Sequence, residues 1–335
     1  MSMKILLIGA KERFETYLPQ NGPLGAFAAE CDKVYLPRGA SAGDIQKAGA
    51  GAGAIVADPM TPVPGEAIMA LPDLRLIQSE GVGVNGFDAA AANEKGVFIC
   101  NCKGVNAGAV AEQNVMLSLM LLRRAVVADA AVRAGHQMDM KETMMLGGIT
   151  ELSQCRVGLL GFGDIARATA RRLSPFGCEL LYWNRTRRPV EEEREYGVIY
   201  CEKADLLAQC DIVMLCVAVT PETSGMANDG FFAAMKPGAL LINTARGDLV
   251  ENEALIRALS SGHLAGAGLD TVSPEPVPED HPLLHLPKEV AEKLVFSPHI
   301  GGITVGSFQR AHRFIWENVW RVEKGEKPLY VTNQP

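Results

Sequence analysis

The stretch Gly161-Phe-Gly-Asp-Ile-Ala166 decides the fold, because it joins an apolar run, Arg156–Leu160, to a helical pattern, Ile165–Leu173. Glycine at position 161 permits a tight turn, and glycine at position 163 lets the backbone approach a phosphate. A helix that begins here presents free N–H groups and the positive end of its dipole to an anion. Two glycines in a turn are common, but between a strand and a helix they predict a pyrophosphate site.

Short apolar runs alternate with amphipathic stretches on both sides of this turn, which predicts βαβ units and parallel sheets. The expected strands of a first series are Met3–Ile8, Lys33–Leu36, Ala54–Ala57, Leu74–Gln78 and Val97–Cys100. Those of a second series are Arg156–Leu160, Glu179–Trp183, Ile212–Val217, Ala239–Asn243, Gly266–Leu269 and Leu294–Phe296. We therefore predict an α/β protein with two doubly wound parallel-sheet domains.

The longest helical pattern, Gly108–Ala134, separates the two series. The last helical pattern, Val305–Val322, has no later strand to cover in the second series, so we expect it to return to the first. This predicts a discontinuous, flavodoxin-like substrate domain of residues 1–103 and 300–335. Residues 104–299 would form a dinucleotide-binding domain of the Rossmann type.

The residues after Glu179–Trp183 bear on the choice of dinucleotide. An acid at the end of this strand would bind the adenosine ribose 2′-hydroxyl, but the chain has Asn184 and then Arg185-Thr-Arg-Arg188. Neutral Asn tolerates a 2′-phosphate, and guanidinium groups bind it in bidentate fashion. We predict NADP, with NAD as the alternative. The arginines could instead form a solvated loop, partly neutralised by Glu191–Glu193.

Composition excludes several other classes. Across 335 residues, 39 acidic and 32 basic side chains give a net charge of −7, which disfavours sequence-independent nucleic-acid binding. The longest apolar stretch, Val115–Leu122, is far shorter than the ~18–20 residues that a membrane span needs. Eight cysteines without a Cys-x-x-Cys spacing predict neither disulfides nor a metal site. Unpaired thiols indicate a reducing compartment, the cytoplasm.

Three later strands end in turns with chemically active residues, Arg246, Glu275 and His299. Ligands of doubly wound sheets bind beyond the carboxyl ends of the strands, so these turns should face one cleft. Arg246 would hold a substrate carboxylate, and His299 would exchange a proton as general acid/base. Glu275 would orient the imidazole and favour its protonated form. Each residue alone could be structural, and Asp270 could be a turn-capping residue.

Taken in order, these segments resemble the D-isomer-specific 2-hydroxyacid dehydrogenases. The matching segments are Gly161–Ala166, Asn243-Thr-Ala-Arg-Gly-Asp248, Leu269-Asp270 with Glu275-Pro276, Ser297-Pro-His-Ile-Gly-Gly302, Gly81-Val-Gly-Val-Asn85, Asn106-Ala-Gly-Ala-Val-Ala-Glu112 and Thr220-Pro-Glu-Thr223. The resemblance implies a nicotinamide-dependent oxidoreductase whose catalytic residues are Arg246, Glu275 and His299. It also implies a homodimer, with the helix after Asn106 in its interface.

The resemblance further implies a substrate site and a coenzyme site. The substrate carboxylate would be bound by Val82, Gly83 and Arg246. The coenzyme would be bound by Val110, Gly161, Gly163, Asp164, Ile165, Asn184, Arg185, Thr186, Val217, Ala218, Thr223, Thr244, Ala245, Asp270, His299 and Gly301. Among these, Asp270 would contact the nicotinamide.

The sequence departs from the family pattern at a few positions. Asn85 replaces an aspartate, Lys103 and Ala218 replace prolines, and Ala166 replaces a third glycine. The segment Gln137–Leu146 lacks the usual tryptophan and carries four methionines. These would fill a core or an interface, or alternatively form an adaptable apolar edge of the substrate pocket.

We therefore predict an oxidoreductase that transfers a hydride between NAD(P)H and a small 2-oxo acid, similar to glyoxylate and hydroxypyruvate reductases. Two alternatives remain open. One is a D-3-phosphoglycerate dehydrogenase, disfavoured because no room follows the last helix for an appended regulatory domain. The other is a nucleotide-sensing binding protein like the corepressors that share this fold.

Overall fold

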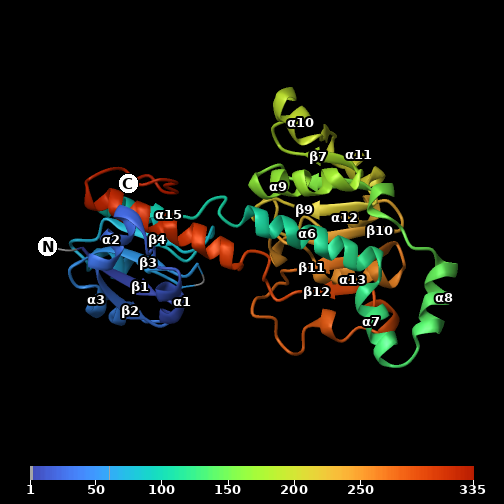
Figure 1. The fold of residues 1–335 in the computed structure, drawn as a ribbon, viewed down its shortest axis with the longest axis horizontal. Coiled ribbons are helices and arrows are strands. Elements are labelled where there is room, and N and C mark those ends of the chain that lie inside the picture. The colour runs from blue at the N-terminus through green and yellow to red at the C-terminus, as the bar shows by residue number, and fades with distance from the viewer. Residues whose placement is uncertain (1–2, 60) are drawn as a thin grey trace. The chain divides into compact units, whose positions relative to one another are not determined.

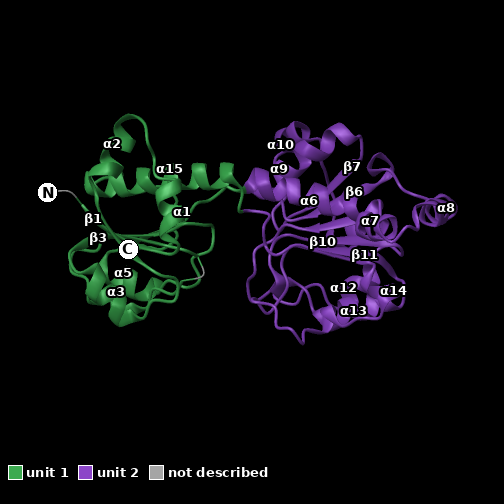
Figure 2. Cartoon of the chain, turned by 60° about the horizontal axis from the view of Figure 1, so that its bottom comes forward, with its two compact units in different colours: residues 1–106, 303–335 green, residues 107–302 purple. Residues whose placement is uncertain are grey.

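The computed structural model describes residues 3–59 and 61–335. The chain divides into two compact units, one of residues 1–106 with 303–335 (unit 1) and one of residues 107–302 (unit 2) (Figure 2). The boundaries expected from the sequence, after residues 103 and 299, each lie three residues before these. Each unit is built on its own parallel sheet.

Unit 1 contains a five-stranded parallel sheet in the order β2-β1-β3-β4-β5 (Figure 1). Its strands are β1 (Lys4–Ile8), β2 (Asp32–Leu36), β3 (Ala52–Ala57), β4 (Leu76–Ser79) and β5 (Phe98–Cys100). Its helices are α1 (Lys11–Thr16), α2 (Gly22–Glu30), α3 (Ala42–Gly49), α4 (Gly65–Met69), α5 (Ala89–Lys95) and α15 (Val305–Glu323). The order 2-1-3-4-5 is that of flavodoxin-like folds, as predicted.

Helix α15 belongs to unit 1 although it follows all of unit 2 in the chain. Arg75 Nη1 donates to the Val322 carbonyl over 2.9 Å, and the Trp320 ring stacks on Phe27 with centroids 5.9 Å apart. Ile315 and Val319 are buried in the same apolar cluster as Ile5. The helix therefore covers one face of the first sheet.

Unit 2 contains a seven-stranded parallel sheet in the order β12-β11-β10-β9-β6-β7-β8. Its strands are β6 (Arg156–Leu160), β7 (Glu179–Trp183), β8 (Ile199–Tyr200), β9 (Ile212–Leu215), β10 (Ala239–Asn243), β11 (Leu264–Leu269) and β12 (Leu294–Phe296). Its helices are α6 (Ala107–Leu122), α7 (Ala125–Arg133), α8 (Gln137–Gly147), α9 (Asp164–Leu173), α10 (Val190–Tyr196), α11 (Lys203–Gln209), α12 (Asp229–Ala234), α13 (Asn252–Ser260) and α14 (Lys288–Ala291). Short 3₁₀ turns are η1 (Leu152–Gln154), η2 (Ser174–Phe176), η3 (Gly247–Leu249) and η4 (Pro282–Leu284). The strand order reverses between β6 and β9, where doubly wound sheets bind their ligands.

Both series of predicted strands are confirmed, but two details of the sequence-based prediction were wrong. The two-residue strand β8 was not predicted, because two residues are too short to show a period. The predicted single helix Gly108–Ala134 is two helices. Arg124 adopts a left-handed backbone with φ 46°, which ends α6 and begins α7.

Close packing brings α6 against the strand that leads to the predicted site. A Cβ atom added at Gly268, in β11, would lie 2.9 Å from Leu117 Cβ of α6, so only glycine allows this approach. Leu117 is fully buried in one of the two apolar clusters of unit 2. The part of α6 around Leu117 therefore lies beside the carboxyl end of β11.

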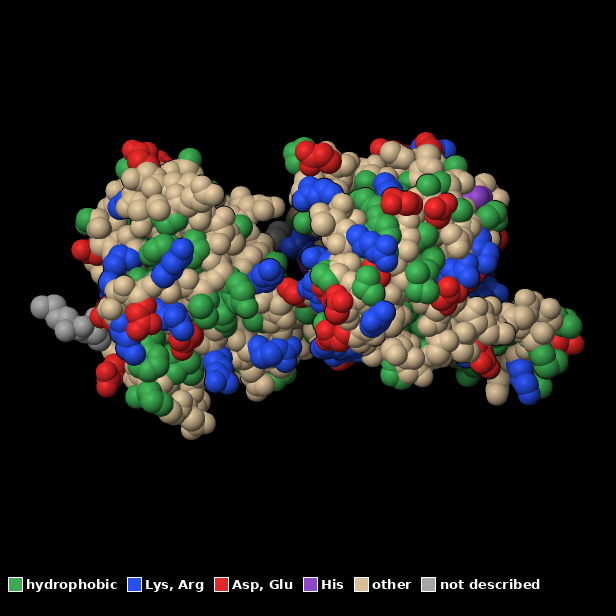
Figure 3. All heavy atoms as spheres, turned by 90° about the horizontal axis from the view of Figure 1, so that it is seen from above, with side chains coloured by type: hydrophobic (Ala, Val, Ile, Leu, Met, Phe, Trp, Pro, Cys, Tyr) green, Lys and Arg blue, Asp and Glu red, His purple; other side chains and the backbone are tan. Residues whose placement is uncertain are grey.

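Charged side chains of both signs are interspersed over the face seen in Figure 3. No single-sign patch dominates this face, in keeping with the modest net charge of −7. Within residues 3–59 and 61–335, no helix is both long and apolar enough to cross a membrane.

Candidate active site

The turn between β6 and α9 forms a cradle of backbone groups. Gly161 has φ 94°, and a Cβ atom there would lie 2.6 Å from the Cys216 carbonyl oxygen. Gly163 precedes α9 and has open space where a side chain would stand. The hydrogen bonds of the helix begin with the Arg167 N–H, which donates to the Gly163 carbonyl. The earlier N–H groups of α9 have no partner among the described residues, so the turn fits a pyrophosphate.

Asn184 and Arg185 follow β7 beside this cradle. The Asn184 side chain accepts from the Phe162 N–H and donates to the Thr186 carbonyl, so it holds two turns together. Arg187 donates to both carboxylate oxygens of Glu193, over 2.8 and 2.9 Å, and Arg188 donates to the Phe162 carbonyl. Arg185 is exposed and forms no ion pair with any residue the structure describes. It is the arginine of this group that remains available to a ligand.

The other predicted coenzyme residues of unit 2 also follow the ends of strands or lie on α6. Val217, Ala218 and Thr223 follow β9, and the Thr223 hydroxyl donates to the Ala218 carbonyl. Thr244 and Ala245 follow β10, and the Thr244 hydroxyl donates to Asn114 of α6 over 2.8 Å. Val110 lies on α6, and Gly301 follows β12. All these strands are parallel, so the residues that follow them line one edge of the sheet.

Arg246 stands at the start of η3, directly after the turn that ends β10. Its guanidinium donates to the Ala245 carbonyl over 2.7 Å and forms no ion pair within the described part of the chain. The next residue, Gly247, has no room for a Cβ atom, which would lie 2.2 Å from the backbone N of Ser273. The Arg246 turn is therefore packed against the loop that carries Glu275.

Glu275 and His299 form the pair predicted from the sequence. His299 Nδ1 lies 2.7 Å from Glu275 Oε1 and 2.9 Å from Oε2. The carboxylate accepts from Nδ1–H, which leaves Nε2 without a partner among the described residues. The two side chains are 35% and 40% exposed. The imidazole is therefore oriented by a carboxylate at one nitrogen and accessible at the other, as a general acid/base requires.

Residues that the sequence analysis missed hold the Glu275 loop in place. The Ser273 carbonyl accepts from Asn252 Nδ2 over 2.8 Å and lies 3.1 Å from Nε2 of the buried His281. The Ser273 hydroxyl donates to Asp248 over 2.5 Å. No local pattern signals these contacts, because the partners lie 8 to 25 residues away.

Asp270 caps the turn that carries His299. Its carboxylate accepts from the Ser297 hydroxyl over 2.5 Å, the Ile300 N–H over 3.0 Å and the Gly301 N–H over 2.9 Å. It is 2% exposed. These bonds match the turn-capping alternative for Asp270, and they fix the backbone on both sides of His299.

In unit 1, the loop after β4 carries Val82 and Gly83. The carbonyls of Gly81, Val82 and Gly83 accept from the Cys102 N–H, Asn101 Nδ2 and the Ser79 hydroxyl. The N–H groups of Val82 and Gly83 have no partner among the described residues. The loop thus presents two backbone donors that could bind a carboxylate.

The thiol nearest the phosphate cradle is not poised to act as a nucleophile. Burial raises the pKa of Cys216, beside Gly161, to about 12, so this thiol stays protonated at neutral pH. In the described ranges, no group of His, Cys, Asp and Glu side chains is arranged to hold a metal ion.

The sequence pattern of one protein family matches this chain. It is described as "D-isomer specific 2-hydroxyacid dehydrogenase, NAD binding domain" and matches residues 115–301. This range contains the phosphate cradle, Arg246, Glu275 and His299.

Individual proteins are similar over most of the chain. A glyoxylate reductase of Thermofilum pendens is 37% identical over 80% of this chain and 78% of its own length. A glyoxylate reductase/hydroxypyruvate reductase of Mus musculus is 39% identical over 69% of each chain. The crystal structure of the TT0316 protein from Thermus thermophilus is 31% identical, with a TM-score of 0.82 over 98% of this chain and 100% of that one.

Proposed function

The chain belongs to the D-isomer specific 2-hydroxyacid dehydrogenase family, and from this premise we propose that Arg246, Glu275 and His299 catalyse its reaction. It is an NAD(P)-dependent oxidoreductase of 2-hydroxy acids. The proposed substrates are small 2-oxo acids such as glyoxylate and hydroxypyruvate, on which its relatives are named to act. The observation that carries the proposal is the His299–Glu275 pair with its accessible Nε2.

The proposed roles follow from the charge that develops on the substrate oxygen. A bound nicotinamide coenzyme supplies the hydride that reduces the 2-oxo carbon. His299 donates its Nε2 proton to the carbonyl oxygen, and Glu275 at Nδ1 stabilises the imidazolium that carries this proton. Arg246 binds the substrate carboxylate and polarises the carbonyl, because its guanidinium has no competing acid among the described residues.

We propose that the unpartnered N–H groups of Val82 and Gly83 in unit 1 bind a carboxylate. Their carbonyls are already held by the fold, so the loop is ordered before substrate binds. Preorganised donors lower the cost of binding.

We propose that NADP(H) is preferred over NAD(H). Asn184 carries no charge to repel a 2′-phosphate, and Arg185 has no ion-pair partner in the described part of the chain. Arg187 and Arg188 are less available, since both already donate to groups of the protein.

A homodimer is proposed from the apolar surface of α7 and α8. Neither helix buries a residue, and the exposed side chains include Val126, Val132, Met138, Met145 and Leu146. Figure 1 shows α8 standing apart from the sheet of its own unit. Such a surface is typical of subunit interfaces. In this proposal the methionine-rich segment forms part of a subunit interface and not part of the core. The double variant Leu146→Glu with Met145→Glu should therefore convert the dimer to monomers, as measured by analytical ultracentrifugation.

A reducing compartment, the cytoplasm, is proposed from the thiols. All eight cysteines are free. Burial raises the pKa of Cys100 and Cys210 to about 12 and that of Cys31 and Cys155 to about 11. They act as small apolar core residues.

One assay tests the proposed activity and coenzyme together. The purified protein is supplied with NADPH or NADH and a panel of 2-oxo acids that includes glyoxylate, hydroxypyruvate, pyruvate and 3-phosphohydroxypyruvate. We expect oxidation of NADPH with the small acids, at a higher kcat/KM than with NADH. Tight coenzyme binding without turnover of any acid would contradict the proposal and favour a nucleotide sensor.

A further inference from the structure

The backbone of His299 is unusual for a residue with a side chain. Its φ is 55°, in the left-handed region that non-glycine residues rarely adopt. The surrounding fold must hold such a conformation in place. The position matters because the direction of the imidazole toward Glu275 follows from it.

Four bonds to Asp270 hold this turn. The Asp270 carbonyl accepts from the His299 N–H over 2.8 Å, and the carboxylate accepts from Ser297, Ile300 and Gly301. No cation pairs with this buried carboxylate among the described residues, so neutral donors alone stabilise its charge. Each of these donors therefore matters to the turn.

Gln113 of α6 supplies the next donor. Its Nε2 donates to the Ser297 hydroxyl oxygen over 2.7 Å and lies 3.3 Å from Asp270 Oδ1. The single hydroxyl hydrogen of Ser297 goes to Asp270, so the hydroxyl must accept from Gln113. The amide thereby sets the direction of the serine hydroxyl. Among the described residues, Gln113 forms no direct hydrogen bond with His299 or Glu275.

The helix is placed to deliver this side chain. Gln113 lies one turn before Leu117, which packs on Gly268 of β11. Gln113 is 8% exposed, and its Cβ and Cγ atoms would each lie 3.3 Å from a Cβ atom at Gly301. A side chain at position 301 would crowd Gln113, and its Cβ atom would lie 2.9 Å from Asp270 Oδ2.

We propose that Gln113 is a positioning residue for the general acid/base His299, acting through Ser297 and Asp270. This rests on the proposed catalytic role of His299. Without the amide, the Ser297 hydroxyl loses its donor and can rotate, and the Asp270 carboxylate loses part of its hydrogen bonding. The turn then samples other conformations, and the imidazole is less often aligned for proton transfer.

The first test replaces Gln113 by Met, which keeps length and volume but has no donor. We expect kcat to fall about tenfold, while the Kd of NADPH changes less than about twofold and the thermal midpoint by a few degrees at most. Gln209→Met, an exposed glutamine on α11, is the matched control and should leave kcat unchanged.

A double-mutant cycle tests the route. If Gln113 acts through Ser297, the fold-decrease in kcat of the double variant Gln113→Met with Ser297→Ala should be no larger than that of the more impaired single variant. If the fold-decreases of the two single variants instead multiply in the double variant, the proposed route is wrong.

The variant Gln113→Glu is measured for the pH dependence of kcat, which a general loss of stability would not change in the expected way. At neutral pH the new carboxylate has no proton to donate and repels Asp270, so kcat should fall further than with Met. As the pH falls the new carboxyl gains a proton and a donor, and kcat relative to wild type should rise. A constant ratio across the pH range would contradict the proposal.

His299→Ala separates this inference from the proposed function. If His299→Ala is inactive and Gln113→Met retains wild-type kcat, the role of Gln113 is wrong and the catalytic assignment stands. If His299→Ala retains full turnover, the catalytic assignment itself fails.

Discussion

Two histidine–glutamate pairs of nearly equal length lie in opposite surroundings. His299 Nδ1 is 2.7 Å from Glu275 in unit 2, and His312 Nε2 is 2.8 Å from Glu80 in unit 1. The first pair is about one-third exposed, whereas the side chains of the second are 1% and 2% exposed. Glu80 directly follows β4, and Glu275 and His299 lie in the loops that follow β11 and β12. His312 lies on α15.

We infer from this difference that solvent exposure decides which of the two pairs can act on a ligand. Glu80 also accepts from Arg13, and the His312 ring packs between Phe14 and Tyr17 with centroids 5.8 and 5.6 Å apart. The second imidazole nitrogen of His312 is buried and has no partner among the described residues. A substrate has no access to it. The buried pair can only stabilise unit 1, and the exposed pair can exchange a proton with a ligand.

The largest expected effect is on the exposed pair. His299→Ala should lower kcat by about 10²–10⁴-fold, the usual contribution of a general acid/base. The free energy of unfolding in urea should change by only about 1 kcal/mol, since the side chain is partly exposed and loses one hydrogen-bonded partner, Glu275. Wild-type turnover of every accepted 2-oxo acid would contradict the comparison.

The buried pair should show the opposite response. His312→Ala should lower the free energy of unfolding by about 2–4 kcal/mol, because it leaves Glu80 one donor short and opens a cavity. The value of kcat should stay within about threefold of wild type at a temperature where the variant is folded. His136→Ala, at a largely exposed histidine, is the control and should leave urea unfolding unchanged.

Removing Arg185 tests the coenzyme side of unit 2. Arg185→Ala should raise the KM for NADPH about tenfold, since a charge-assisted bond to the 2′-phosphate is lost. The KM for NADH should change less than about twofold. Arg257→Ala, which breaks a surface pair with Asp229, serves as control. Equal effects on both coenzymes would contradict NADP preference.

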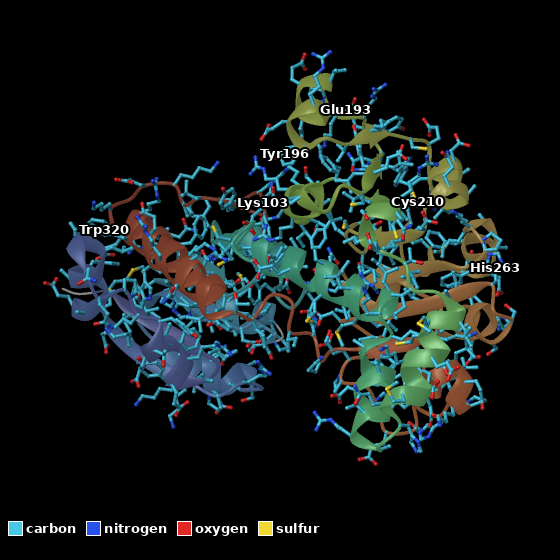
Figure 4. The ribbon with its side chains drawn as sticks, turned by 45° about the vertical axis from the view of Figure 1, so that its right-hand side comes forward. Lys103, Glu193, Tyr196, Cys210, His263 and Trp320 are labelled. Atoms are coloured by element: carbon cyan, nitrogen blue, oxygen red, sulfur yellow. The ribbon has the colours of Figure 1, made fainter. Side chains whose placement is uncertain are left out.

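The Arg187–Glu193 ion pair, with one exposed and one nearly buried side chain, extends the comparison to the pH dependence of stability. Glu193, labelled in Figure 4, is nearly buried, and its partner Arg187 is exposed. The bond from Arg187 lowers the pKa of Glu193 below its ordinary value of 4.5. The stabilisation is therefore complete above pH 4.5 and is lost as the pH falls through the lowered native pKa. At about pH 6 the Tm of wild type should be slightly higher than that of Glu193→Gln, and this difference in Tm should disappear as the pH is lowered. A difference in Tm that does not change with pH would contradict this prediction.

The sequence predicts the strands and the His299–Glu275 pair but not the residues that support them. Apolar runs such as Ala239–Asn243 mark strands directly, and strand ends place Arg246, Glu275 and His299 on one edge. Gln113 carries no such signal, because its partners lie 157 and 184 residues away and a polar residue on a helix predicts solvent exposure. Glu80 and His312, 232 residues apart, were missed for the same reason. The break at Arg124 was missed because no glycine marks it.

The most direct test applies one chemical change to both pairs. Glu275→Gln and Glu80→Gln each replace a carboxylate by a neutral amide of the same shape, and each variant is measured for kcat and for urea unfolding. We expect Glu275→Gln to lower kcat at least about tenfold with unfolding within about 1 kcal/mol of wild type. Glu80→Gln should lower the unfolding free energy by about 2–4 kcal/mol with kcat within about threefold. If Glu275→Gln instead mainly destabilised the fold, or Glu80→Gln mainly abolished turnover, the division of roles between the two pairs would be wrong.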